Sequence, residues 1–256
     1  MRILWNSKAA MVANQDKLDA ISNNIANINT TGYKRVEVSF KDLMSETLDR
    51  TGYPTNSDSA YTGTGVRITE PYRDDTQGKL LQTGLKTDIA IDGQGYFRVT
   101  KFDGSYGYTR DGSFTIDRDG KLVNAAGDVL ELEFNEGYSY ENLKLSEEAI
   151  LINYEGELSV KDGETVKTVA VIPLYNTLGG DTMISTGENT YAPKEGATVY
   201  RTSDAELYQG YLEGSNVDLS EEITELILTQ RAFQLGTKAM ETADQMRGMI
   251  NNLRSR

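Results

Sequence analysis

The side chains that could do chemistry in this protein are mainly carboxylates, because the chain has 39 Asp and Glu residues but no cysteine and no histidine. Thiol nucleophiles, serine–histidine–aspartate triads and zinc sites with Cys or His ligands are therefore excluded. Hydrolysis by paired carboxylates and a carboxylate-only Mg²⁺ or Ca²⁺ site are the chemistries that these residue types still allow.

The motifs that resemble such sites lack the spacing that the chemistry needs. The segment Asp92–Phe97 begins with Gly-x-Gly, but Arg98 stands where a dinucleotide-binding loop needs a third glycine. The segment Asp117–Gly120 resembles part of a calcium loop, but its glycine comes too early and no Glu closes the loop. No carboxylate pair is set apart by apolar and aromatic neighbours, as a glycosidase needs. We therefore expect no catalytic residue, no metal site, no cofactor and no enzymatic activity.

The acidic residues of the middle of the chain are better explained as turns between short strands. Asp-Gly or Glu-Gly steps recur from Asp92-Gly93 to Asp162-Gly163, and such steps between alternating apolar residues are a strong hairpin signal. Residues 51–66 have the composition of a loop or extended linker. The sequence predicts a central antiparallel β domain with strands at 89–91, 96–99, 113–116, 121–123 and 168–172.

The N-terminal end of the chain has a different pattern, which predicts a helix over Leu4–Asn29. Asn14 is typical of a polar core residue that specifies helix register, and Gly32 can adopt the left-handed conformation after the last turn. This periodicity alone is compatible with an ordinary core and with an assembly interface. Two series recur every seven residues: Leu4, Met11, Leu18, Ile25 and Ser7, Asn14, Ile21, Ile28.

The C-terminal end predicts a second long helix over Val217–Leu253. Asp218 is the expected N-cap, and Glu221 follows at the spacing of a capping box. The apolar stripe then changes phase, which is typical of a stutter that locally unwinds a coiled coil. Its members are Ile223, Leu226, Gln230, Phe233, Thr237 and Met240, followed by Met246, Ile250 and Leu253.

Charge separates the ends from the middle. The two ends are close to neutral, so that residues 49–216 account for the net charge of −13. An acidic middle argues against nucleic acid and anionic membranes as partners, whereas near-neutral ends can pack against copies of themselves. No apolar stretch approaches the roughly 20 residues that span a bilayer, and we expect neither a Sec-type signal peptide nor membrane insertion.

Three groups of residues resemble one protein family. The segment Asp19–Lys34 closely resembles the N-terminal signature of bacterial flagellar rod and hook proteins, and Gly210–Ile223 with Thr229–Phe233 resembles their C-terminal signature. Asp88–Phe97 and Tyr108–Phe114 are similar to the β-domain core of that family. The signature residues are Asn23, Asn24, Ala26, Asn27, Asn29, Thr31, Gly32, Tyr33, Asn216, Val217, Gln230, Arg231 and Ala232.

The resemblance implies an α+β fold in which long N- and C-terminal helices pair as an inner coiled-coil domain beside a central antiparallel β domain. The implied boundaries are 1–47 with 214–256 for the helical assembly domain, 48–75 for an extended linker or rod-type segment, and 76–213 for the outer β domain. The residues expected to pack subunits together are Leu4, Met11, Leu18, Ile21, Ile25, Ile28, Ile223, Leu226, Phe233, Met240, Ile250 and Leu253.

Within the family, the length of the chain and the stretches Thr62–Arg67 and Leu207–Leu212 resemble the distal-rod members most. The implied function is a structural subunit of the distal rod in the flagellar basal body, exported from the cytoplasm and polymerised into a tubular shaft that transmits torque from motor to hook. The implied partners are copies of itself, adjacent proximal-rod and hook subunits, the surrounding envelope rings and the flagellar export apparatus.

Two other functions stay open at this point. The first is a proximal-rod or other hook–basal-body paralogue. The second is a cell-surface binding module or carbohydrate-active β domain that trimerises through its helical ends, which predicts ligand binding by the fragment 67–212.

Overall fold

The computed structural model forms two units. Unit 1 comprises Met1–Ala26, Val36–Asp74 and Asp218–Arg256, and unit 2 comprises Asn27–Arg35 and Asp75–Val217. The structure describes residues 2–43, 45–47, 61–63, 65–140, 145–146, 149–162, 165–179 and 183–254.

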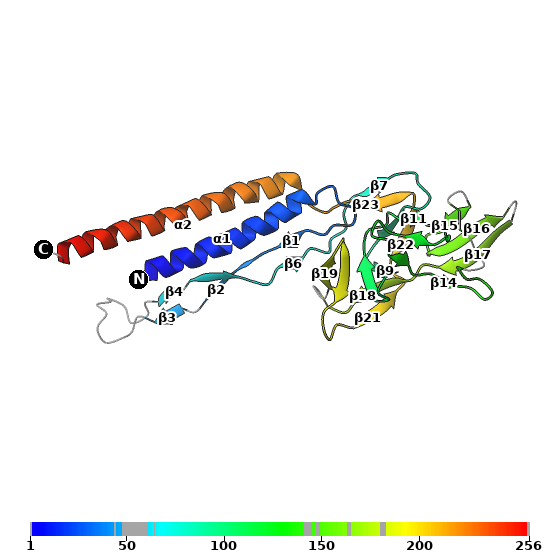
Figure 1. The fold of residues 1–256 in the computed structure, drawn as a ribbon, viewed down its shortest axis with the longest axis horizontal. Helices are drawn as coiled ribbons and strands as arrows, with labels where there is room; N and C mark the ends of the chain where they lie inside the picture. Colours follow the sequence, from blue (N-terminus) through cyan, green and yellow to red (C-terminus); the bar gives the residue numbers. More distant parts are fainter. Residues whose placement is uncertain are drawn as a thin grey trace. The chain divides into compact units, whose positions relative to one another are not determined.

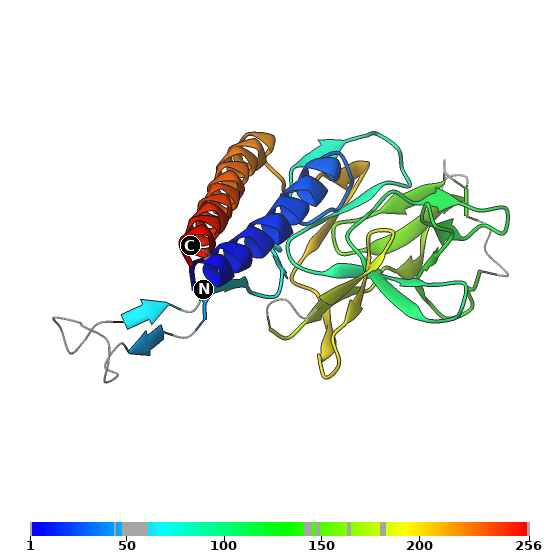
Figure 2. The same cartoon turned by 60° about the vertical axis from the view of Figure 1, so that its left-hand side comes forward.

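Unit 1 is built on two long helices that lie side by side (Figures 1 and 2). Helix α1 spans Arg2–Ala26 and helix α2 spans Leu219–Arg254, with 25 and 36 residues. The end of α1 contacts the start of α2, because Asn24 Nδ2 donates to Glu222 Oε2 over 3.3 Å. Nearer the other end of α1, Met11 contacts Thr237, whose hydroxyl lies 3.6 Å from the methionine sulfur. The two helices are therefore antiparallel.

Helix α1 ends three residues earlier than predicted, at Ala26. The reason is tertiary: the Asn24 side chain binds the returning main chain at Val36, accepting from its N–H at 2.9 Å and donating to its carbonyl at 3.0 Å. Residues 27–29 form a turn that closes where Thr30 N donates to Asn27 O. The expectation that Ile28 continues the helical stripe is consequently wrong.

Helix α2 begins at Leu219, directly after the predicted N-cap and two residues later than the predicted start at Val217. Asp218 Oδ1 accepts from the main-chain N–H groups of Ser220 at 2.8 Å and Glu221 at 3.3 Å, which satisfies two of the donors that a helix start leaves open. The prediction of Asp218 as N-cap is confirmed.

The rest of unit 1 consists of three antiparallel pairs of short strands. These strands correct the prediction of a loop or extended linker for residues 51–66. Tyr61–Gly63 and Val66 belong to strands, while residues 51–60 and 64 lie outside the described residues. Val66 and Ile68 alternate towards α1, so their burial favours a strand. The antiparallel pairs are β1 (Val36–Glu37) with β6 (Tyr72–Arg73), β2 (Phe40–Asp42) with β5 (Val66–Ile68), and β3 (Ser45–Thr47) with β4 (Tyr61–Gly63).

Unit 2 is an antiparallel β domain, as predicted. In its described residues the largest sheet has the order β11-β12-β13-β9-β10-β20-β19, and β18 joins β9 to β21. A second sheet has the order β14-β17-β16-β15, and two further pairs are β22 with β8 and β23 with β7. The strands are β7 Leu80–Gln82, β8 Ile89–Asp92, β9 Tyr96–Thr100, β10 Tyr106–Thr109, β11 Thr115–Ile116, β12 Leu122–Val123, β13 Val129–Leu130, β14 Glu133–Phe134, β15 Ile150–Ile152, β16 Glu157–Asp162, β17 Thr165–Val171, β18 Leu174–Thr177, β19 Met183–Gly187, β20 Thr190–Pro193, β21 Val199–Thr202, β22 Glu206–Gln209 and β23 Tyr211–Glu213.

Two of the Asp-Gly steps, Asp103-Gly104 and Asp119-Gly120, make the tight turns that their composition predicts. Gly104 closes the β9–β10 hairpin with φ +81°, and Gly120 closes the β11–β12 hairpin with φ +76°. Two predicted strands are shorter than expected. Thr115–Ile116 is the strand within 113–116, where Ser113 forms an isolated bridge to Asp88, and Leu122–Val123 is the strand within 121–123.

The core of unit 2 lies on the inner faces of these strands. Ile89, Ile91, Phe97 and Val99 are fully buried in it, and burial of each such side chain stabilises the fold by about 1.5–3 kcal/mol. Arg98, which occupies the place of a third glycine, points to the other face of β9. There its guanidinium lies 4.1 Å from the ring centre of Tyr175 and pairs with Glu131, so its role is structural.

Candidate functional site

Three motifs that are far apart in the sequence meet inside unit 2 in one buried ion cluster, which consists of Lys34, Arg110 and Glu213. Their side chains are 1%, 3% and 0% exposed. Lys34 Nζ lies 2.6 Å from Glu213 Oε1, and Arg110 Nη1 lies 3.3 Å from Glu213 Oε2. One carboxylate therefore pairs with two cations in a buried site, where an unpaired charge is costly.

Main-chain groups also bind the side chains of the buried ion cluster. Gly78 N donates to Glu213 Oε1 over 2.9 Å, and Lys34 Nζ donates to Thr76 O over 2.7 Å. Arg110 Nη2 donates to Gly93 O over 2.9 Å. These bonds connect five separate segments of the chain, so the cluster is a structural crosslink without a covalent bond.

Electrostatics in the cluster follow from burial. Burial lowers the pKa of Lys34 below its ordinary value of 10.5, Glu213 opposes this change, and the nearby Arg110 reinforces it. Asp75 also raises the pKa of Lys34 and accepts a hydrogen bond from Tyr96 Oη over 3.2 Å. Burial raises the pKa of Tyr96, so that it stays a neutral donor.

Residues of the two terminal signatures surround this cluster. Gly32 N donates to Glu213 O over 2.7 Å, and Arg35 N donates to Asn216 Oδ1 over 2.7 Å. Gly32 has φ +65°, as predicted, and a Cβ atom there would lie 2.6 Å from the Arg110 carbonyl carbon. Thr31 Oγ1 donates to Asp111 Oδ1 over 2.7 Å. Glycine is thus required at position 32 both for its dihedral angle and for the close approach of the main chain at Arg110 and Asp111.

Sequence reasoning did not single out Lys34, Arg110 or Glu213 as site residues. Each of them lies within a motif that carries the family resemblance, beside glycines that allow two main chains to approach. A charged residue beside a glycine in such a motif could have indicated a buried ionic site. The partner of each charge, however, cannot be inferred from sequence spacing.

The remaining signature residues have varied surroundings. Asn24 is buried between Val36 and Glu222 in unit 1, whereas Asn27 Oδ1 accepts from Thr30 within the turn of unit 2. Val217 is buried. The exposed signature residues are Asn23, Ala26, Asn29, Gln230, Arg231 and Ala232, and Tyr33 is half-buried.

The structure brings some of the expected subunit-packing residues together between α1 and α2. The helices approach closely at Gly236, where a Cβ atom would lie 3.0 Å from Met11 Cγ, and Lys17 pairs with Glu225. Ile21 is buried, whereas Leu4, Met11, Leu18, Ile25, Leu226, Phe233 and Met240 are half-buried. Ile223, Ile250 and Leu253 are exposed, and Ile28 lies in unit 2.

The side chain of Asn14 takes a different partner from the one that a register role needs. Its Nδ2 donates to the Ala10 carbonyl one turn earlier in α1, over 2.8 Å. The role of Asn14 in register stays a prediction.

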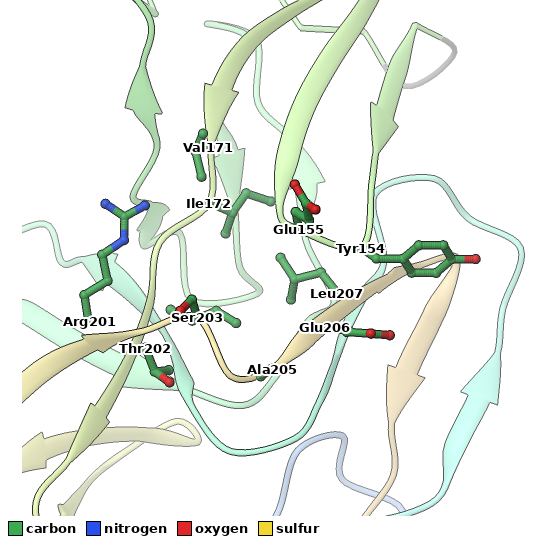
Figure 3. Close-up of a pocket in the computed structure, with 11 residues that line it drawn as sticks. Tyr154, Glu155, Val171, Ile172, Arg201, Thr202, Ser203, Ala205, Glu206 and Leu207 are labelled. Atoms are coloured by element: carbon green, nitrogen blue, oxygen red, sulfur yellow. The ribbon is translucent and has the colours of Figure 1, made fainter.

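Unit 2 also contains a cavity of about 520 Å³ (Figure 3). Arg201 and Tyr154 lie at opposite ends of it, with Ile172 and Leu207 between them. Its charged groups contact the β domain itself: Arg201 Nη1 pairs with Glu133 over 2.6 Å, and Glu206 accepts from Tyr208 Oη over 3.2 Å. These contacts are structural and do not assign a substrate to the cavity.

Within the described ranges, no three His, Cys, Asp or Glu residues form a group that could hold a metal ion. None of the helices in the described part of the chain combines the length and the apolar character that crossing a membrane requires.

Comparison with known families gives three matches in chain order. Residues 6–34 match the family described as flagella basal body rod protein, and residues 90–187 match the flagellar hook protein FlgE/F/G D1 domain. Residues 208–253 match the flagellar basal body rod FlgEFG protein C-terminal family. The three matched ranges cover most of α1 and α2, and they include the buried ion cluster residues Lys34, Arg110 and Glu213.

Individual relatives are similar over nearly their whole length. The flagellar basal-body rod protein FlgG of Borreliella burgdorferi is 35% identical, with 99% of each chain covered. FlgG of Bacillus subtilis is 34% identical, also with 99% of each chain covered. The flagellar hook-basal body complex protein FlhP of the same bacterium is 28% identical, with 99% of this chain and 100% of FlhP covered.

Proposed function

The chain belongs to the family of the flagellar basal-body rod protein FlgG, and we propose that it polymerises into a tubular shaft that transmits torque from motor to hook. It is a structural subunit of the distal rod and is located in the flagellar basal body. Rod proteins of this family polymerise with themselves and with neighbouring rod and hook components. The similarity to FlgG from end to end is the observation that carries the proposal.

The exposed apolar residues of α2 support self-assembly through the helices. Ile227, Leu228 and Leu235 are large, apolar and more than half exposed in the single chain. Exposed apolar side chains of this size favour an interface, because their removal from water is favourable. We propose that α1 and α2 form a coiled-coil assembly domain and that their apolar stripes pack against neighbouring subunits.

The proposed domain division follows from this role. The helical assembly domain is proposed for 1–47 with 214–256, the rod-type segment for 48–75 and the outer β domain for 76–213. Residues 27–35 pack within unit 2, so the residues of unit 1 are the part that we assign to subunit contacts. The acidic β domain then stays solvated while the near-neutral helices associate.

The proposal includes a non-enzymatic role, contacts with the surrounding envelope rings, and passage through the flagellar export apparatus.

The alternative of another hook–basal-body paralogue is less well supported. In Bacillus subtilis the FlgG protein is 34% identical to this chain and FlhP is 28% identical. Full-length similarity to rod proteins gives no support to a cell-surface binding module.

Two substitutions in the helices test the proposed function. Ile25→Asp and Leu226→Asp each place a charge at a half-buried position, where an unpaired charge costs several kcal/mol once a neighbour covers it. Cells that carry either variant should not swim, and their basal bodies should lack the distal rod in electron micrographs. The matched control is Gln15→Asp at an exposed position of α1.

A second measurement separates failed assembly from failed folding. The purified variants should keep the far-ultraviolet circular dichroism of the β domain and its resistance to protease. Normal rods and normal swimming with both variants would refute the assembly role of these helices. Loss of the proximal rod together with the distal rod in a deletion strain would instead indicate a proximal-rod paralogue.

A further inference from the structure

The C-terminal end of α2 extends past the helix that it packs against. Met11 of α1 lies beside Gly236 and Thr237 of α2, and the helices are antiparallel. Because α1 begins only nine residues before Met11, the residues of α2 after about 245 lie beyond Arg2, its first described residue. At a rise of 1.5 Å per residue, this overhang is about 14 Å long. Figure 1 shows the same overhang of α2 beyond α1.

The overhang continues the face of α2 that contacts α1. Positions seven residues apart along that face are Glu222 and Thr229, which are buried, and Gly236 and Ala243, which are half-buried. The next position in this series is Ile250, which is 62% exposed because α1 has ended. A face that is covered along α1 therefore becomes an uncovered apolar surface in the last turns.

Four residues form this uncovered surface, which we name the tail stripe. Met246, Met249, Ile250 and Leu253 are 53%, 59%, 62% and 77% exposed. Their spacing of three, four and seven residues places them on one side of the helix. Each of them is large and apolar, so the stripe is suited to an apolar acceptor.

The same unit contains an apolar acceptor between α1 and β5, which we name the α1–β5 groove. Its volume is about 300 Å³. Six apolar residues line it, namely Trp5, Ala9, Val12, Ala13, Val66 and Ile68, together with the charged residues Lys8, Asp16 and Arg67. A cavity of about 150 Å³ holds one benzene molecule, so this groove has room for roughly two apolar side chains.

We propose that the tail stripe of one subunit inserts into the α1–β5 groove of a second copy of the chain. The inference rests on the proposed function and specifies which surfaces meet. The tail stripe cannot reach the groove of its own chain, because α2 remains helical to Arg254 and leads away from Trp5. Two different surfaces of one chain that complement each other make a head-to-tail contact, which repeats into a helical filament.

The absence of native cysteine makes the contact directly testable by crosslinking. Val12→Cys marks the groove, Ile250→Cys marks the tail stripe, and both positions are more than half exposed, so neither change disturbs the fold. Leu235→Cys is the matched control, because position 235 is at least as exposed on α2 as position 250 but lies about 22 Å from it along the helix. Cells would produce two single-cysteine chains in place of the native one, and isolated basal bodies would be treated with a short bismaleimide.

The pair of Val12→Cys with Ile250→Cys should give crosslinked dimer at least roughly tenfold above the pair of Val12→Cys with Leu235→Cys, since two groups held across an interface have effective concentrations of about millimolar. Ile250→Cys alone should give no dimer. Equal crosslinking of both pairs, or dimer from Ile250→Cys alone, would overturn the head-to-tail contact.

The same experiment distinguishes failure of this contact from failure of the proposed function. Rods that assemble and rotate without the expected crosslink would leave the proposed function standing and refute this contact. Distal rods that lack the native chain in cells producing it would refute the proposed function. The proposed contact would then be refuted as well.

Discussion

Replacing Glu213 by Gln should lower the free energy of unfolding of the full chain by about 3–5 kcal/mol at pH 7, the usual cost of leaving a buried charge without its partner. Gln keeps the shape of the side chain and one oxygen that accepts from Lys34 Nζ and Gly78 N. Its amide NH₂ group then faces Arg110 Nη1, donor against donor, at the present distance of 3.3 Å. Two buried cations remain with only the half-buried Asp75 nearby.

The pH dependence of this loss follows from Lys34. The folded-state pKa of Lys34 is already below 10.5, so between these two values the unfolded chain binds more protons than the folded chain, and stability rises with pH. Without Glu213 the folded-state pKa of Lys34 falls further, and this window widens towards neutral pH. The difference in stability between native chain and variant should therefore be largest at pH 7 and smaller at pH 10.

Urea unfolding followed by circular dichroism measures both quantities. The thermal midpoint should fall by roughly 6–20 °C for a change of this size in a domain of this length. The isosteric control Glu195→Gln, at an exposed position, should change stability by less than about 0.5 kcal/mol. Lys34→Met should cost less than Glu213→Gln, because it leaves Glu213 paired with Arg110. Equal losses of stability for Glu213→Gln and Lys34→Met would contradict the electrostatic origin of the effect. A loss for Glu213→Gln that grows from pH 7 to pH 10 would contradict it as well.

Substitutions at three further positions test the local geometry by thermal unfolding of the purified chain. Gly112→Ala should destabilise unit 2 by more than about 3 kcal/mol, because the new Cβ would lie 1.7 Å from the Ile89 carbonyl oxygen; a wild-type melting curve would contradict this contact. Gly248→Ala should stabilise α2 by about 1 kcal/mol, since no atom lies within 4 Å of the new methyl group and alanine favours a helix; a loss would mean that the overhang is not helical. Asp218→Ala should cost about 1 kcal/mol through the lost cap, and Asp218→Asn should restore most of it.

The local features of the fold were predictable from nearby residues. The Asp218 cap, the left-handed Gly32 and the tight turns at Gly104 and Gly120 each depend on residues a few positions apart. Strand alternation and the seven-residue series are local in the same sense, so the α+β architecture could be expected without coordinates. The family resemblance was carried by such short motifs as well.

The end of α1 could not be predicted in this way. Periodicity continues through Ile28, but Asn24 binds the main chain of Val36, twelve residues later, and the chain leaves the helix. The strand at Tyr61–Gly63 is similar, because its partner is the strand at Ser45–Thr47, earlier in the chain. A helix or strand boundary that depends on a distant hydrogen bond leaves no mark in the local pattern.

By itself, the sequence determined the two helical ends, the turn-rich acidic middle and the absence of cysteine and histidine chemistry. Only the tertiary structure decided that Lys34, Arg110 and Glu213 share one buried site, since Glu213 is 179 residues from Lys34 and 103 from Arg110. It also decided that the apolar line of α2 loses its partner at Ile250, because this depends on where α1 begins relative to α2. Composition and periodicity act over a few residues, whereas charge pairing and the coverage of a helix face depend on distances that only the folded chain sets.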